Sequence, residues 1–189
     1  MIDWLIDKDI QLFIYLNSLG SVYWDGFWLI LTNKFSAIPL YFILVYIIYK
    51  YFGLRKTILL VLLVAIMIFF SDQTSNLFKY SFKRLRPCHD ETISSLMRLV
   101  KERCGGLYAF FSAHAANSMA IAVFFSFLLK SKFKYIPYFL IFWALLVAYS
   151  RIYIGVHFPL DVLTGVAFGV FYGFIFYKLY QFFLVRLTQ

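Results

Sequence analysis

The chain has 189 residues, of which 63% are hydrophobic, 23% aromatic and only 14% charged, and its mean hydropathy is +0.80. Soluble domains are about 45–50% apolar, so this composition excludes an ordinary soluble protein and predicts an all-α, polytopic transmembrane helix bundle of about five to six spans. The net charge of +9 is spread over short loops, which argues against a nucleic-acid partner and for topology signals and attraction to anionic lipid.

The N-terminal region, residues 1–34, is expected to be interfacial or re-entrant. Residues 2–18 alternate apolar and polar side chains at helical spacing, with Asp7 and Asp9 on the polar side. The apolar run is too short to span a bilayer, so we expect an interfacial amphipathic helix. Acidic residues stand where a signal peptide needs basic ones, so no cleavable leader is expected. Residues 22–33 form either a short interfacial helix or part of a kinked span.

Five apolar stretches follow, and each is predicted to be a membrane span. They are predicted at residues 37–52, 57–79, 113–129, 136–149 and 160–177. Short loops connect them, apart from the long connection at residues 80–108, and loops of this length are often functional. One compact bundle is expected, a single integral membrane domain over residues 1–189.

Two patterns within the spans predict contacts between helices. A polar run, Asp72 to Asn76, ends the second span, and polar residues at such a place favour a cavity over a lipid-facing surface. Gly165, Gly169 and Gly173 repeat every four residues on one face of the last span, which favours close helix packing.

The order of the spans places three polar clusters on one side of the membrane, because two crossings separate each cluster from the next. The clusters are residues 79–86, 112–114 and 150–161. Three basic turns lie on the other side, at residues 55–56, at 130–134 and after 178. The positive-inside rule makes these turns cytoplasmic. Basic residues in the long loop count against this orientation, but compact turns beside the spans are the better predictors.

Cys88 and Cys104 are the only two cysteines and both lie in the long loop. A disulfide between them would fit an oxidising extracytoplasmic compartment, and closing this loop would contribute ~3 kcal/mol in the chain-entropy model. The alternative is two free thiols in a reduced loop.

The first polar cluster places Lys79 seven residues before Arg86, and Pro87 follows. On one helix this spacing is about two turns, so both cations could point the same way until the proline stops the helix. Arginine offers a planar fork of donors for phosphate oxygens, and lysine a point charge. The alternative is ordinary snorkelling of two cations at the end of a span.

The second cluster stands where a helix is expected to begin. Ser112 is a natural N-cap, and the free N–H groups of a helix N-terminus attract anions. His114 in the first turn could act as a general acid, and Asn117 shares its polar face. The alternative is a plain cap with an interfacial histidine.

The third cluster contains Arg151, His157 and Asp161 at the break between two spans. A carboxylate four residues after a histidine can hold one imidazole nitrogen and leave the other free to attack. Arg151 adds a cation for a phosphate. The alternative is a packed loop histidine beside an aspartate that starts a helix.

Metal binding has weak support, because the histidines and Asp161 lack a dense ligand motif. His89, beside Cys88, is expected to be a loop residue. No metal and no cofactor are therefore expected.

Together, these clusters resemble the type 2 phosphatidic acid phosphatase superfamily, whose members include bacterial membrane lipid phosphatases and soluble vanadium haloperoxidases. The resemblance rests on Lys79 with Arg86 and Pro87, on Ser112 to His114, and on Ser150 to Asp161. It covers about residues 57–178. The family's usual Pro-Ser-Gly-His differs here, where Phe111 replaces the proline and Ala113 the glycine.

The resemblance implies roles for single residues. His157 would be the nucleophile that forms a phosphohistidine, Asp161 would orient it, and His114 would protonate the leaving oxygen. The phosphate oxygens would be held by Lys79, Arg86, Ser112, Arg151 and the backbone N–H of Ala113.

The expected function is a metal-independent lipid phosphatase in a bacterial inner membrane, with its site on the periplasmic side and the bilayer and a lipid phosphate as partners. Small size favours undecaprenyl diphosphate, and phosphatidylglycerol phosphate, phosphatidic acid and lipid A phosphates are further candidates. The alternatives are a non-catalytic lipid-phosphate binding or transport protein and, against the length and the spans, a vanadate-dependent haloperoxidase. The sequence does not determine the oligomeric state.

Overall fold

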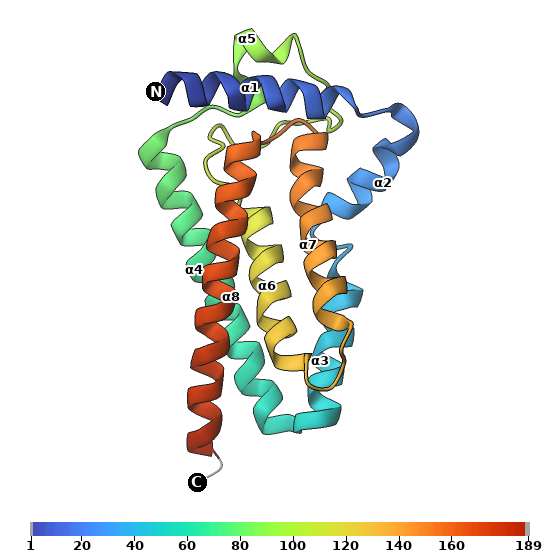
Figure 1. Cartoon of the computed structure of the whole chain (residues 1–189), viewed down its shortest axis with the longest axis vertical. Helices are drawn as coiled ribbons and strands as arrows, with labels where there is room; N and C mark the ends of the chain where they lie inside the picture. The colour runs from blue at the N-terminus through green and yellow to red at the C-terminus, as the bar shows by residue number, and fades with distance from the viewer. Residues whose placement is uncertain (1, 188–189) are drawn as a thin grey trace.

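The computed structural model describes residues 2–187, and its N-terminal part lies across one end of the molecule (Figure 1). Helix α1 (Ile2–Ser18) runs roughly perpendicular to the long helices and covers their ends. Helix α2 (Val22–Thr32) slants down beside the bundle. Its 11 residues reach only about 16 Å at 1.5 Å per residue. Residues 22–33 therefore form a short helix and not a span.

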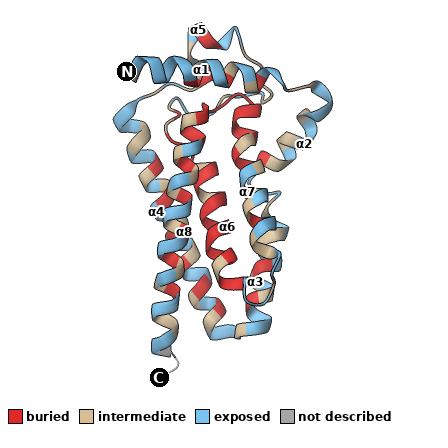
Figure 2. Ribbon diagram, in the orientation of Figure 1, coloured by how far each residue is buried: buried red, intermediate tan, exposed pale blue. Residues whose placement is uncertain are grey.

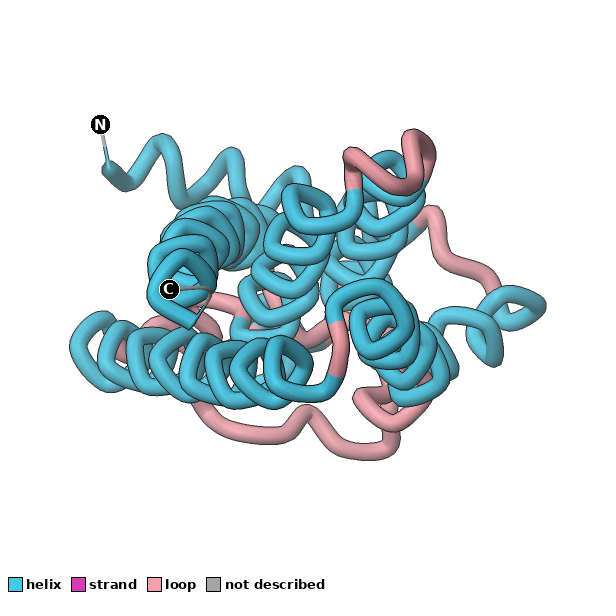
Figure 3. The backbone as a smooth tube through the Cα atoms, turned by 90° about the horizontal axis from the view of Figure 1, so that it is seen from below, coloured by secondary structure: helices cyan, strands magenta, loops and turns pink. Residues whose placement is uncertain are grey.

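Five helices form the bundle. They are α3 (Ile38–Phe52), α4 (Leu54–Phe82), α6 (Ala113–Leu129), α7 (Ile136–Tyr153) and α8 (Pro159–Leu187). Among the described residues, α4, α7 and α8 are long and apolar enough to cross a membrane, and α3 and α6 are shorter apolar helices beside them. The end-on view shows the five packed side by side (Figure 3). The expected all-α polytopic bundle with an interfacial N-terminal helix is confirmed.

Burial shows which helices face lipid. Helix α6 is buried along most of its length, and the helices around it expose one face (Figure 2). Phe42, Phe69, Phe142 and Phe171, on four different helices, are each more than half exposed. Large apolar side chains on an outer surface are expected where the surroundings are lipid tails. The fold is therefore a ring of lipid-facing helices around a central one.

The glycines of α8 set the distance between α8 and the central helix α6. A Cβ atom added at Gly165, Gly169 or Gly173 would lie 2.5–2.6 Å from a backbone oxygen of α6 or of its N-cap. Only a residue without a side chain fits at such a distance. The three glycines do form the close helix contact that their spacing predicts.

The long connection runs from residue 83 to residue 112, because α4 continues to Phe82. It contains a short 3-10 helix, η1 (Pro87–His89), and one turn of α-helix, α5 (Glu91–Ser94). The predicted boundaries of 80–108 were therefore early at both ends. This connection, α1 and the α7–α8 turn all lie at one end of the bundle, and the basic turns lie at the other (Figure 1).

We expect Gly169→Ala to lower the melting temperature in detergent, because its Cβ would lie 2.5 Å from Ala116 O and 2.7 Å from Met119 Cβ. Overpacking of this kind costs ~1–3 kcal/mol. The matched control is Gly26→Ala, since nothing lies within 4 Å of a Cβ added there, and a helical alanine gains ~0.5–1 kcal/mol over glycine. Equal melting temperatures for the two variants would contradict the packing role.

Candidate active site

The three polar clusters meet at the end of the bundle that α1 covers. Arg151, Arg86 and Lys79 all act electrostatically on His157. His114 lies within electrostatic reach of both His157 and Arg151. The fold therefore brings together residues from α4, the long connection, α6, α7 and the α7–α8 turn. This convergence is the one that the order of the spans predicts.

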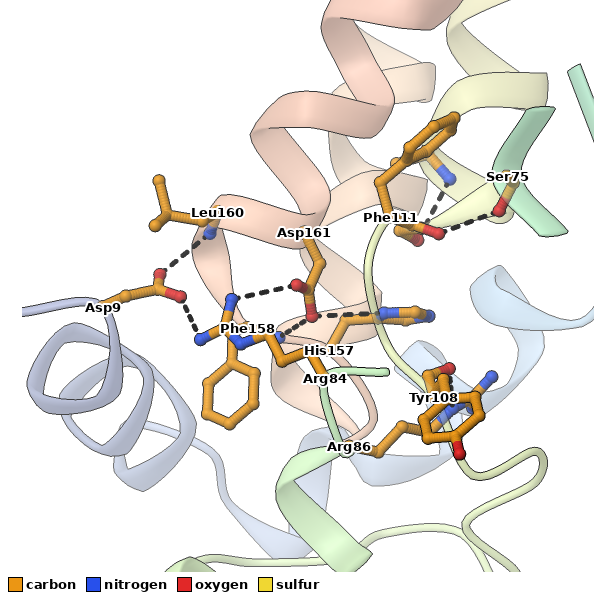
Figure 4. A network of polar contacts seen from close by, with 12 residues as sticks. Asp9, Ser75, Arg84, Arg86, Tyr108, Phe111, His157, Phe158, Leu160 and Asp161 are labelled. Atoms are coloured by element: carbon orange, nitrogen blue, oxygen red, sulfur yellow. Dashed lines mark hydrogen bonds and ion pairs between the residues drawn. The ribbon is translucent and has the colours of Figure 1, made fainter. Parts of the chain in front are cut away.

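His157 and Asp161 face each other at the start of α8 (Figure 4). His157 Nδ1 lies 3.5 Å from Asp161 Oδ2, and both side chains are buried. The same Oδ2 accepts a hydrogen bond from the backbone N–H of Phe158 at 2.8 Å. Because the carboxylate faces Nδ1, a proton is favoured on that nitrogen, and Nε2 keeps its lone pair.

The charge state of His157 follows from its surroundings. Burial, and then the positive charges of Arg151, Arg86 and Lys79, hold the pKa of His157 well below its usual value of 6.5. A protonated imidazole would have to share a site of low dielectric with three cations. His157 is therefore neutral at neutral pH, which is the form that can attack an electrophile.

Arg151 is a buried cation without an anionic partner. Its side chain donates to the hydroxyl of Thr32, and its Nε is buried without a hydrogen-bond partner. Within residues 2–187 no carboxylate lies at ion-pair distance from it, and the same is true of Lys79. Buried charge of this kind is costly unless a ligand supplies the counter-charge. The site is thus prepared for an anion.

Arg86 is held in place by the long connection. Its Nε donates to the carbonyl of Tyr108 at 3.3 Å and its Nη1 to that of Cys104 at 2.9 Å. An isolated antiparallel bridge pairs Leu85 with Tyr108. Cys88 and Cys104 form a disulfide with their Cα atoms 6.0 Å apart. The loop thereby fixes two donors of Arg86 and leaves the rest of the fork for a ligand.

The second motif forms the N-terminus of α6. Ser112 is the N-cap, and its Oγ accepts from Ala115 N at 3.5 Å. Its backbone N–H donates to the carbonyl of Asp161 at 3.0 Å, which ties the two helix starts together. The N–H groups of Ala113 and His114, in the first turn, have no acceptor within the helix. They are available to an anion beside the cations.

Phe111, in place of the family's proline, is fully buried. Its ring stacks on Phe168 with centroids 4.6 Å apart, and its carbonyl accepts from Ser75 Oγ at 2.9 Å. Packing and a hydrogen bond from α4 therefore hold the turn before Ser112.

One geometric expectation was wrong. Lys79 and Arg86 do not share a helix, because α4 ends at Phe82 and Lys83 adopts a left-handed conformation. Arg86 lies in extended backbone just before η1. The two cations still act on the same histidine, but the turn at Lys83 and the loop direct Arg86, and helical periodicity does not.

The structure adds two residues that sequence reasoning missed, Arg84 and Asp9. Arg84 Nη1 lies 3.0 Å from Asp161 Oδ1, and its Nη2 lies 2.6 Å from Asp9 Oδ2. Asp9 Oδ1 also accepts from the backbone N–H of Leu160 at 2.8 Å. A chain of contacts thus runs from α1 through Arg84 to the carboxylate that faces His157 (Figure 4).

Asp9 was expected on the exposed side of the interfacial helix, and it is 4% exposed. Burial raises its pKa, although Arg84 and the N–H of Leu160 act in the other direction. The signal that could have found it is a second stripe on α1. Asp9, Phe13 and Asn17 recur every four residues, and all three are buried.

No group of three or more His, Cys, Asp or Glu side chains that could hold a metal ion occurs in residues 2–187. What the site offers is a neutral imidazole oriented by a carboxylate, a second histidine, several cations without counter-charge and the free N–H groups of a helix start. This set can bind a phosphate, attack it and protonate a leaving oxygen.

Comparison with known proteins identifies the family. The sequence profile of the PAP2 superfamily matches residues 56–184. Two proteins named lipid A 4'-phosphatase are similar over 94% of this chain. The one from Bacteroides thetaiotaomicron is 36% identical, with 79% of its length covered, and the one from Porphyromonas gingivalis is 30% identical, with 75% covered. The chain belongs to the PAP2 superfamily and is a membrane lipid phosphatase, a phosphoric ester hydrolase.

Two crystal structures share the fold. Aquifex aeolicus LpxE superposes with a TM-score of 0.68 at 24% identity, over 89% of this chain and 93% of that one. The first transmembrane PAP2 type phosphatidylglycerolphosphate phosphatase from Bacillus subtilis gives a TM-score of 0.73 at 20% identity, over 93% of this chain and 85% of that one. At these identities the likeness concerns the architecture, a multi-pass membrane bundle.

We expect Arg84→Gln to lower kcat on the order of 10- to 100-fold with little change in KM, because displacing a reacting group by ~1 Å can cost 100-fold. Asp9→Asn should have a smaller effect of the same kind. The double variant should lose little more than Arg84→Gln alone, since both act through one contact. Asp7→Asn, at an exposed position on the same helix, is the matched control. A wild-type kcat in Arg84→Gln would contradict the positioning role.

Proposed function

We propose that the protein hydrolyses its substrate through a phosphohistidine. With the anionic phosphate bound among the cations, His114 carries a proton. His157 Nε2 attacks phosphorus, the bond to the leaving oxygen breaks, and His114 donates its proton to that oxygen. Water then attacks the phosphohistidine, with His114 as base, and releases inorganic phosphate. Asp161 keeps the proton of His157 on Nδ1 throughout, 3.5 Å from its own Oδ2.

The phosphate-binding groups of this proposal are Lys79, Arg86, Ser112, Arg151 and the N–H of Ala113. The observation that supports it most strongly is Arg151, which is 5% exposed and has a buried Nε without a partner. Such donors stabilise negative charge that increases in the transition state. The cations supply the charge stabilisation that a metal would otherwise provide, so the proposed mechanism uses neither a metal nor a cofactor.

The proposed substrate is the phosphomonoester of an acylated sugar, of the lipid A type. Its support is that two proteins named lipid A 4'-phosphatase match 94% of this chain at 36% and 30% identity. Undecaprenyl diphosphate, which the small size of the chain favours, is the competing substrate. Phosphatidylglycerol phosphate and phosphatidic acid are the others.

The test is phosphate release by the purified protein in detergent, with EDTA present throughout and the four lipid phosphates assayed side by side. We expect the highest kcat/KM with lipid A and a loss of at least about 1,000-fold in His157→Ala, since the nucleophile is removed. A higher kcat/KM with one of the other lipid phosphates would contradict the proposed substrate. Activity that vanished with EDTA, or that survived His157→Ala, would contradict the mechanism.

We further propose that the site faces the periplasm from a bacterial inner membrane. The basic turns at the opposite end support this orientation, and so does the disulfide between Cys88 and Cys104 at the site's end, because disulfides persist in oxidising compartments.

An impermeant thiol reagent should label Cys88 and Cys104 in intact spheroplasts after reduction, and should not label them before. The variant Cys88→Ser/Cys104→Ser is the control for background labelling. Labelling confined to inverted vesicles would contradict the proposed orientation and would place the two cysteines on the cytoplasmic side.

A further inference from the structure

A cavity of about 470 Å³ lies beside the active site, between the end of α2 and helices α3, α4, α6 and α7. Its wall includes Ala113 and His114 but not His157, Lys79 or Arg86. It therefore adjoins the site on the side of the histidine that donates the proton. Because that proton goes to the leaving oxygen, the cavity is where the leaving group must lie.

Asp72 and Asn117 both line this cavity and contact each other. Asn117 Nδ2 donates to Asp72 Oδ1 at 2.9 Å, and Asn117 Oδ1 is buried without a hydrogen-bond partner. Asp72 is at ion-pair distance from no cation in the part of the chain that the structure describes. Asn117 Oδ1 is thus a buried acceptor without a donor at a cavity that Asp72 also lines, and the carboxylate of Asp72 has the amide of Asn117 as a donor. A buried acceptor such as Asn117 Oδ1 is costly unless a ligand supplies an N–H or O–H group.

The cavity becomes apolar one helical turn farther from the site. Ile68 precedes Asp72 by four residues on α4, and Ile121 follows Asn117 by four on α6, and both line the wall. Trp143 and Val147 of α7 complete this part. Four residues are about 6 Å of helix. A matching leaving group carries hydrogen-bond donors near the reacting oxygen and apolar chains beyond them.

We propose that Asp72 and Asn117 bind hydroxyl or amide donors of the leaving group and select an acylated sugar. A prenyl chain has no donor to offer, so a prenyl phosphate would leave Asn117 Oδ1 without a partner and would add no donor for Asp72. Discrimination by unpaired polar groups is far stronger than discrimination by apolar fit. The proposal rests on the proposed function for the chemistry at His114, and it assigns the substrate preference to two residues that touch neither the phosphate nor the nucleophile.

The test compares two substrates in each of three proteins. The substrates are lipid A, an acylated glucosamine disaccharide phosphate, and undecaprenyl phosphate. The proteins are the wild type, Asn117→Leu and, as the matched control, Gln73→Leu, which changes an exposed residue next to Asp72. We expect Asn117→Leu to lower kcat/KM for lipid A about tenfold or more and to change that for undecaprenyl phosphate by less than about threefold. Gln73→Leu should match the wild type on both.

If Asn117→Leu lowered kcat/KM equally for both substrates, Asn117 would support the structure of the active site and not the choice of leaving group. If kcat/KM for lipid A did not fall, the leaving group would lie elsewhere. Either result overturns the inference and leaves the proposed function intact. A wild type that prefers undecaprenyl phosphate overturns both.

Product inhibition gives a second measurement, which does not depend on a variant that folds. Dephosphorylated lipid A should inhibit the wild type at a concentration at least about tenfold below that of undecaprenol, since only the former carries donors for the two oxygens. Equal inhibition by the two alcohols would contradict the proposal.

Discussion

The carboxylate of Asp161 is the contact on which the arrangement of the site depends. One oxygen accepts from Arg84, and the other accepts from Phe158 N and faces His157. The backbone carbonyl of the same residue accepts from Ser112 N. Asp161 therefore joins the start of α8 to the start of α6 and, through Arg84, to α1. Moving this residue would move His157, the N-terminus of α6 and the interfacial helix α1 together.

The electrostatics of the site follow from two different uses of charge. Arg84 has two carboxylate partners and is a structural cation. Arg151 and Lys79 have none within the described residues, so their charge has no carboxylate to balance it. A buried cation is tolerated when it is paired or when it binds an anion. The site thus contains a cation paired with carboxylates and, in the described part of the chain, cations without a carboxylate partner, although Arg84 and Lys79 lie only five residues apart in the chain.

Much of the fold and the site could be predicted, because hydropathy and span order act over the whole chain. The long apolar runs predict spans, and an even number of crossings brings Lys79, His114 and His157 to one end. No comparable rule predicts the path of a loop from its sequence. The left-handed turn at Lys83 and the bridge between Leu85 and Tyr108 direct Arg84 and Arg86, and no periodicity in the sequence encodes them. Asp9 was predicted to lie on the exposed side of its helix because a carboxylate on an amphipathic helix is expected to face solvent. Its partner, Arg84, lies in the long connection, whose path the sequence does not predict.

The sequence by itself determined the membrane class, the order of the apolar helices, the meeting of the polar clusters at one end of the bundle and the residue types gathered there, because each depends on composition, spacing or chain order. Only the tertiary structure decided which cations are paired, how α1 is anchored to Asp161, and that Asp72 and Asn117 share a cavity with His114. Those facts depend on contacts between residues far apart in the chain, such as Asp9 with Arg84, and the distance between two atoms is set by the packing of every helix that lies between them.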